Sequence, residues 1–233
     1  MAKIRPGGLV GQISGSVGGD TFSRNRGGPY IRNRAIPTVS TTDFAMAAKN
    51  RLGLASTRWQ TLSDAQRNAW TNWATNRPIT DRLGESITLS GQQAYILINA
   101  RLEQAGDTLL DIPPTAGAPD GLLEISLTAE AANGDSAATV TFSPSLEANH
   151  RLWVWSALVA SKGVNYVKNL LRLTTISDPE AASPLDILSG VTERHGPLAV
   201  GQVLHVQAQV FDTETGLVSG VRRARVEVTE ASP

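Results

Sequence analysis

The stretch LWVWSALV, residues 152–159, is the longest apolar run in the chain. Its valine, tryptophan and leucine side chains favour a strand, and eight residues are too few for a typical buried helix. Six more short segments of strand composition lie on either side of it, each bounded by turn residues: 122–127, 138–142, 170–173, 187–191, 203–211 and 221–228. The sequence therefore predicts seven strands in the C-terminal half.

Seven strands separated by turns over about 110 residues are typical of an antiparallel β-sandwich of the fibronectin type III or immunoglobulin kind. We expect Trp153 or Trp155 to face inward from the third strand as the core tryptophan. A stretch rich in proline, glycine and alanine, LDIPPTAGAPDG at residues 110–121, precedes the strands. It predicts a linker over 111–121 and a β-sandwich domain over 122–233.

Residues 41–110 change to a period near 3.6, which predicts a helical body of three helices. The first helix covers residues 44–62 and carries Trp59 near its end. Trp70 and Trp73 lie on one face of the second helix. We expect these three tryptophans to form a small core rather than a recognition surface.

Helix ends in this region carry capping signals. Ser63 and Gln66 have the spacing of a capping box, which starts the second helix at residue 64. Ser90 is placed to cap the third helix, and Gly106 is placed to end it. The overall prediction is an α+β multidomain chain with an extended N-terminal arm, three helices and a sandwich.

The arm, residues 1–40, combines many glycines with six cations and one acid. Such a segment is costly to order alone, yet apolar side chains recur along it, which is typical of a segment that orders against a partner. Gly18-Gly19 predicts a hairpin, and two Arg-Asn-Arg triplets flank a second turn. We therefore predict a basic docking arm whose protein-interface residues are Phe22, Arg24, Arg26, Tyr30, Arg32 and Arg34.

The arm's chemistry suits either of two partners. Guanidinium pairs bind carboxylates on an acidic protein surface, and they also contact DNA phosphates. The chain has 21 basic and 21 acidic side chains, but residues 1–40 carry a net charge of +5 and residues 111–233 carry −6. This overall neutrality and the lack of a basic helix disfavour nucleic acid as the partner.

Composition and motifs exclude several classes. The absence of cysteine excludes disulfides and thiolate sites, and no apolar run has the length of a membrane span. The start, MAKIRPGG, lacks the apolar part of a secretory signal, so we expect synthesis in the cytoplasm and no membrane partner. The three histidines, His150, His195 and His205, lack metal or triad spacing, and we expect ordinary surface or edge histidines. The prediction is a protein without enzyme activity, metal or cofactor.

Two stretches carry a family resemblance: GQISGSVGGDTFSRNRGGPYIRNR at residues 11–34 and LSDAQRNAW at residues 62–70. They resemble small virion structural proteins of tailed bacteriophages and prophages, in which such an arm precedes a tryptophan-containing helix and a variable β domain. The resemblance covers roughly the first 105 residues. It implies a component of the virion and brings no catalytic activity with it.

The resemblance and the charge gradient together predict a capsid decoration or cement protein, whose arm docks on neighbouring capsid subunits. The expected partners are other virion proteins, either the major capsid protein or tail and neck proteins, and we expect a homo-oligomer. The alternative is a structural or adhesion protein of the neck, tail or baseplate. A DNA-binding protein is the third hypothesis, and a glycan hydrolase is a distant fourth.

Overall fold

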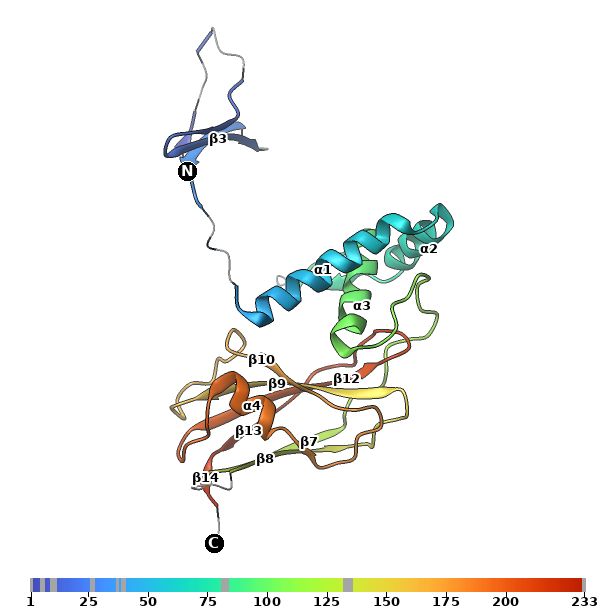
Figure 1. Ribbon diagram of the computed structural model, residues 1–233, viewed down its shortest axis with the longest axis vertical. Coiled ribbons are helices and arrows are strands. Elements are labelled where there is room, and N and C mark those ends of the chain that lie inside the picture. The colour runs from blue at the N-terminus through green and yellow to red at the C-terminus, as the bar shows by residue number, and fades with distance from the viewer. Residues whose placement is uncertain are drawn as a thin grey trace. The chain divides into compact units, whose positions relative to one another are not determined.

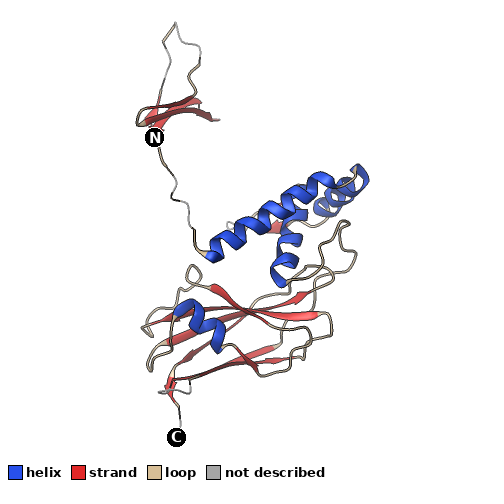
Figure 2. Ribbon diagram, in the orientation of Figure 1, coloured by secondary structure: helices blue, strands red, loops and turns tan. Residues whose placement is uncertain are grey.

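The computed structural model describes residues 2–4, 7–8, 12–25, 28–36, 38, 41–80, 84–131 and 136–231. The chain forms two compact units, Met1–Ala47 and Ala48–Pro233. Its described part is α+β, with four helices and several antiparallel sheets (Figures 1 and 2). The predicted mixed class is therefore confirmed.

The first unit contains a four-stranded antiparallel sheet, here called the N-terminal sheet. Its strand order is β1-β4-β3-β2. The strands are β1 (Ala2–Lys3), β2 (Gly15–Val17), β3 (Asp20–Asn25) and β4 (Gly28–Asn33). Gly18, with φ +57°, makes the turn between β2 and β3, as the double glycine predicts.

Three helices follow: α1 (Asp43–Thr61), α2 (Asp64–Thr75) and α3 (Gly91–Ala105). The capping box that begins α2 is confirmed, because Ser63 and Gln66 exchange side-chain and backbone hydrogen bonds of 2.9 and 3.4 Å. Ser90 begins α3 in the same way, and Gly106 ends it in the left-handed conformation. A small hairpin of β5 (Ile79–Thr80) and β6 (Ser86–Ile87) lies between α2 and α3 in the chain.

The C-terminal half forms two four-stranded sheets that face each other (Figure 1). The first has the order β10-β9-β12-β13, and the second has the order β11-β8-β7-β14. All neighbouring strands are antiparallel except β14 and β7. The strands are β7 (Glu124–Ala131), β8 (Ala137–Ser143), β9 (His150–Val159), β10 (Arg172–Ile176), β11 (Leu185–Asp186), β12 (Val203–Asp212), β13 (Arg222–Glu227) and β14 (Thr229–Glu230).

The strand predicted over residues 187–191 is wrong. This stretch belongs to helix α4 (Leu188–His195), and the neighbouring strand β11 has only two residues. The Asp186 carboxylate accepts a hydrogen bond of 2.9 Å from the Leu188 backbone N–H, which satisfies a donor at the helix start. Gly190 then packs so closely on Thr174 that a Cβ atom would collide with the Thr174 carbonyl oxygen.

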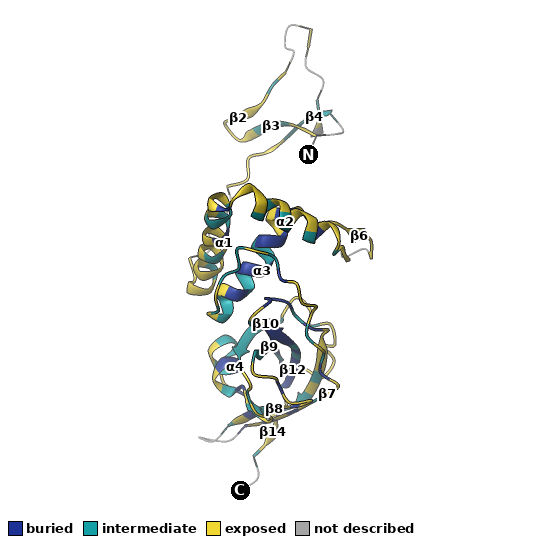
Figure 3. Cartoon of the chain, turned by 90° about the vertical axis from the view of Figure 1, so that its right-hand side faces the viewer, coloured by how far each residue is buried: buried dark blue, intermediate teal, exposed yellow. Residues whose placement is uncertain are grey.

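Two hydrophobic clusters stabilise the second unit (Figure 3). One lies between the two sheets and includes Leu152, Val154 and Leu204. The other joins α2 and α3 to the outer face of β9 and β12, where Trp153 stacks on Phe211 with ring centroids 4.7 Å apart. The predicted inward tryptophan is therefore wrong: Trp153 and Trp155 alternate with the inward residues and belong to the helical cluster.

Two side chains of α2, and Arg77 just after its end, bind the backbone that follows α3. The indole N–H groups of Trp70 and Trp73 donate to the carbonyl oxygens of Asp111 and Pro114, at 3.0 and 2.9 Å. Arg77 donates to the carbonyl oxygen of Ala116 at 3.2 Å.

The proposed division into residues 1–40, 41–110, 111–121 and 122–233 stays a prediction. Within the described residues, no helix combines the length and apolarity needed to cross a bilayer.

Candidate functional site

The N-terminal sheet holds the predicted interface residues. Phe22 on β3 lies opposite Ile31 on β4, and Ser23 lies opposite Tyr30. Lys3 on β1 also lies opposite Tyr30. The sheet is closed at its turn end by a hydrogen bond of 2.7 Å from the Arg34 backbone N–H to the Gly19 carbonyl oxygen.

This register divides the predicted residues between two faces, because directly opposed residues of antiparallel strands point to the same face and successive residues alternate. Phe22 and Arg24 share one face, which we call the Phe22 face. Tyr30 and Arg32 share the other, which we call the Tyr30 face. Arg34 directly follows β4, and Arg26 lies outside the described residues.

Two residues join these faces without having been predicted. Ile31 belongs to the Phe22 face, and Lys3 belongs to the Tyr30 face. The alternation within YIRNR indicates that Ile31 points to the other face of the strand from Tyr30. The position of Lys3 beside Tyr30 follows only from the pairing of β1 with β4. Each face therefore presents an aromatic ring together with at least one cation.

The N-terminal sheet has no core of its own. None of the described residues between 3 and 47 whose burial is known is buried, and Phe22, Tyr30 and Ile31 are only half-buried. The strands of this sheet carry no buried segment in Figure 3. Val17 is 74% exposed. Small sheets gain independent stability by covering an apolar face, and this one leaves both faces accessible within its unit.

The cations of this sheet are not neutralised within it. Among the described residues, no ion pair involves Lys3, Arg24, Arg32 or Arg34. The only acid in the segment, Asp20, lies at the start of β3 opposite Asn33. Aromatic and guanidinium groups without a partner of their own are the residue types that anchor protein interfaces.

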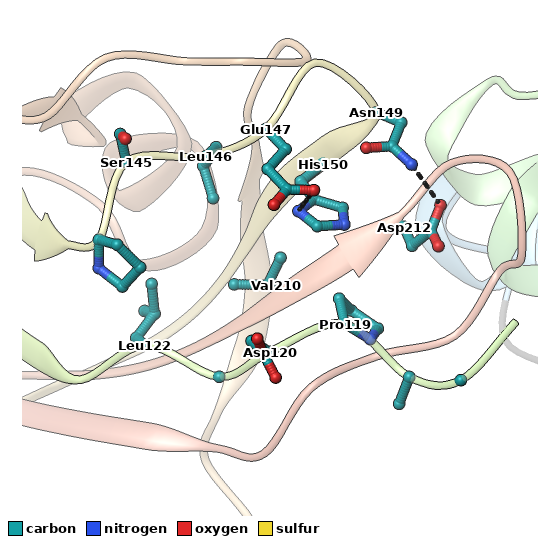
Figure 4. A pocket seen from close by; sticks show the side chains of 14 residues that line it. Pro119, Asp120, Leu122, Ser145, Leu146, Glu147, Asn149, His150, Val210 and Asp212 are labelled. Atoms are coloured by element: carbon teal, nitrogen blue, oxygen red, sulfur yellow. Dashed lines mark hydrogen bonds and ion pairs between the residues drawn. The ribbon is translucent and has the colours of Figure 1, made fainter.

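A second candidate is an acidic cavity of about 410 Å³ at one end of the two sheets. Asp120, Glu147 and Asp212 line it (Figure 4). The Asp212 carboxylate already accepts hydrogen bonds from the Glu214 backbone N–H and the Thr215 hydroxyl, at 2.8 and 2.7 Å. The Asp212 carboxylate therefore stabilises the loop after β12. The carboxylate of Glu147 lies 3.8 Å from the Nδ1 atom of His150.

The described residues contain no group of three or more histidine, aspartate or glutamate side chains that could hold a metal ion. His195 places Nε2 3.1 Å from both oxygens of the buried Ser156. His205 is 8% exposed on the central strand β12, so the expectation of a surface or edge position is wrong for this residue. A strand with alternating polar residues, HVQAQ at 205–209, gives no signal that its polar face is covered.

Comparisons with protein-family models, with curated proteins and with solved structures found no match for the chain. The geometry of the N-terminal sheet is therefore the main structural guide to function.

Proposed function

We propose that this chain is a non-enzymatic structural protein of a bacteriophage virion, which docks on other virion proteins through its N-terminal sheet. The observation that carries the proposal is the sheet's lack of any buried described residue, combined with its aromatic and cationic faces. Such a sheet gains apolar burial and charge neutralisation only when an acidic, partly apolar protein surface covers it. Its synthesis would occur in the host cytoplasm and its final location would be the particle.

We propose the head surface as the site of docking, with the protein acting as a capsid decoration or cement protein. A segment that reaches along or between capsid subunits would use both faces, which agrees with the division of Phe22 and Tyr30 between them. The net charge of −6 in residues 111–233 suits a part of the protein that faces solvent. The homo-oligomeric state that we expect would follow the local symmetry of the particle.

We further propose that residues 124–230 form a β-sandwich of the fibronectin type III kind. Counted along the chain, the first, second and fifth strands (β7, β8 and β11) share one sheet, and β9, β10, β12 and β13 share the other. In a constant immunoglobulin domain the fourth strand belongs to the first sheet. Here the fourth strand, β10, pairs with β9 instead.

The neck, tail or baseplate is the alternative address for the same docking mechanism. The copy number per particle separates the two: a decoration protein would be present in hundreds of copies, and a connector in about a dozen or fewer. DNA binding receives less support, because Arg24 and Arg32 point to opposite faces and cannot both follow one phosphate backbone on one face.

The test is co-sedimentation of the protein with DNA-free phage capsids. The full chain should bind saturably, and a chain that begins at Thr41 should not bind. Arg24→Glu and Arg32→Glu, one on each face, should each weaken binding about tenfold, the equivalent of about 1.4 kcal/mol. Lys162→Glu makes the same charge change in the second unit and serves as the control.

If truncation abolishes binding but neither Arg24→Glu nor Arg32→Glu weakens it, the result would support docking by the arm. It would not support the use of both faces of the sheet. Equal binding by the full and truncated chains would contradict docking by the N-terminal sheet. If neither chain binds the capsid, the same set of variants should be tested on isolated necks and tails. Binding to DNA that falls steeply with salt would favour the nucleic-acid hypothesis instead.

A further inference from the structure

The two faces of the N-terminal sheet differ in chemistry. Strand register and alternation assign four apolar side chains to the Phe22 face: Val17, Phe22, Pro29 and Ile31. Around Tyr30, the other face carries hydroxyl groups and cations, from Lys3, Ser16, Thr21, Ser23 and Arg32. The sheet is therefore amphipathic, and its two faces suit different partners.

The apolar side chains of the Phe22 face are accessible. Val17 is 74% exposed, and Phe22 and Ile31, which lie directly opposite each other, are only half-buried. Gly15 lies opposite Phe22 on β2, and nothing lies within 4 Å of the position that a Cβ atom of Gly15 would take. The face therefore has an apolar centre, with space beside the Phe22 ring for an apolar group of a partner.

Two opposite charges flank this apolar centre. Asp20, Phe22 and Arg24 alternate along β3, so all three side chains point to the Phe22 face. Asp20 and Arg24 each lie two residues from Phe22, roughly 7 Å along the strand in opposite directions. Neither takes part in an ion pair with any residue that the structure describes. The face therefore has one negative end and one positive end.

This charge arrangement is complementary to itself. Two copies can stack with their Phe22 faces together and with their β3 strands running in opposite directions. A two-fold axis then passes between the two Phe22 side chains, so Asp20 of each copy faces Arg24 of the other. Stacked sheets lie about 10 Å apart, and an aspartate opposite a long arginine side chain can span that separation. An acidic surface would instead place a like charge opposite Asp20.

We propose that the Phe22 face pairs with the Phe22 face of a second copy of this chain. The Tyr30 face, which carries Lys3 and Arg32 and no acid, stays available for an acidic virion protein. This inference rests on the proposed function for the second partner only, because the pairing of copies is a property of the isolated chain.

The pairing surface is small. Most of it comes from β3 and β4, which have six residues each, so the pair should be weak in dilute solution. Neighbouring copies that are docked on one particle have a high effective concentration, which favours the pair. The pairing would then link adjacent copies on the particle, while the Tyr30 face holds each copy to its virion partner.

The experiment is sedimentation velocity of the full chain at concentrations from about 10 µM to about 1 mM. The unmodified chain should form dimers as its concentration rises. Asp20→Lys gives a face with two cations, and Arg24→Glu gives a face with two anions, so each variant alone should pair about tenfold more weakly. An equimolar mixture of the two variants should recover the dimer. That recovery would also show that both variants fold.

Two further variants serve as controls. Arg32→Glu makes the same charge change as Arg24→Glu, but on the Tyr30 face, so it should leave the pairing unchanged. The double variant Asp20→Lys/Arg24→Glu exchanges the two charges and should pair as the unmodified chain does. Dimers in solution without any binding to capsids, necks or tails would contradict the proposed function and leave the pairing intact.

Three results would overturn the proposal. The unmodified chain could remain monomeric at every concentration. Asp20→Lys and Arg24→Glu could each pair as tightly as the unmodified chain, which would show that these charges do not meet. The mixture of the two variants could stay monomeric, which would assign the Phe22 face to a different protein.

Discussion

His195 links the stability of the second unit to pH through a single contact. Its Nε2 atom lies 3.1 Å from the carbonyl oxygen of Ser156, a residue buried in β9. Burial is the main cause that lowers the pKa of His195. The Ser156 bond raises it, and Arg172 and Arg194 lower it. The net result is a folded pKa below the unfolded value of about 6.5.

Because the folded pKa is lowered, the unfolded chain binds more protons once the pH falls below about 6.5. Above that pH the free energy of unfolding should have its full value. It should decrease as the pH falls toward the folded pKa. Urea unfolding at about pH 7.5 and about pH 5 measures this loss. His195→Gln keeps a donor at the same place and should reduce the loss, while His205 still contributes. An equal loss in the variant would contradict the assignment to His195.

Single residues also show where sequence patterns fail. The run LWVWSALV predicts a strand correctly, but period two alone does not say which face meets the other sheet. Both faces of β9 are apolar because one packs on the second sheet and the other packs on helices. His205 lies on the outer face of the neighbouring strand β12, where residues of the segment between β9 and β10 lie beside it. Such burial depends on contacts between segments far apart in the chain.

Among the elements, the helices with local capping signals were the most predictable. The Ser63–Gln66 and Ser90–Gln93 pairs act within four residues, so the starts of α2 and α3 follow from the sequence. Helix α4 was missed because its start depends on Asp186 and its position depends on a close approach of Gly190 to β10. The N-terminal hairpin was predicted from its glycines, whereas the pairing of β1 with β4 was not.

Gly216 controls the contact between α3 and the loop after β12. It has φ +67°, and a Cβ atom there would lie 2.7 Å from the Ile98 Cγ2 atom. Gly216→Ala should lower the free energy of unfolding by about 2–4 kcal/mol, because backbone strain and overpacking add. Gly220→Ala is the matched control, since nothing lies within 4 Å of its Cβ position. Similar urea midpoints for both variants would contradict this explanation.

At the scale of the whole molecule, the two units differ in what stabilises them. Both hydrophobic clusters lie within Ala48–Pro233, and the N-terminal sheet has no buried described residue. The charge gradient along the sequence anticipates this difference between the two ends. The division of the interface residues between two faces was not predictable, because it depends on the register between β3 and β4.

Removing residues 1–40 should therefore leave the thermal midpoint of the remaining chain unchanged. The cut at Thr41 preserves the start of α1, where the Thr42 carbonyl oxygen accepts a hydrogen bond of 2.9 Å from Met46. Differential scanning calorimetry measures the midpoint.

In the intact chain, hydrogen exchange should be fast at backbone amides of residues 15–33 and slow after assembly on the particle. Slow exchange in the isolated protein would show that the sheet needs no partner.

The bonds from Trp70, Trp73 and Arg77 to the backbone of residues 111–116 have a mechanical consequence. A peptide segment that is free between two folded parts stretches first when the parts are pulled apart. Here two side chains of α2, together with Arg77 just beyond its end, hold that segment along its length, and the helical cluster packs the same helices against β9 and β12. A tensile load applied through α1 would therefore pass into the sheets as shear across packed side chains. The backbone of residues 111–116 would carry little of that load.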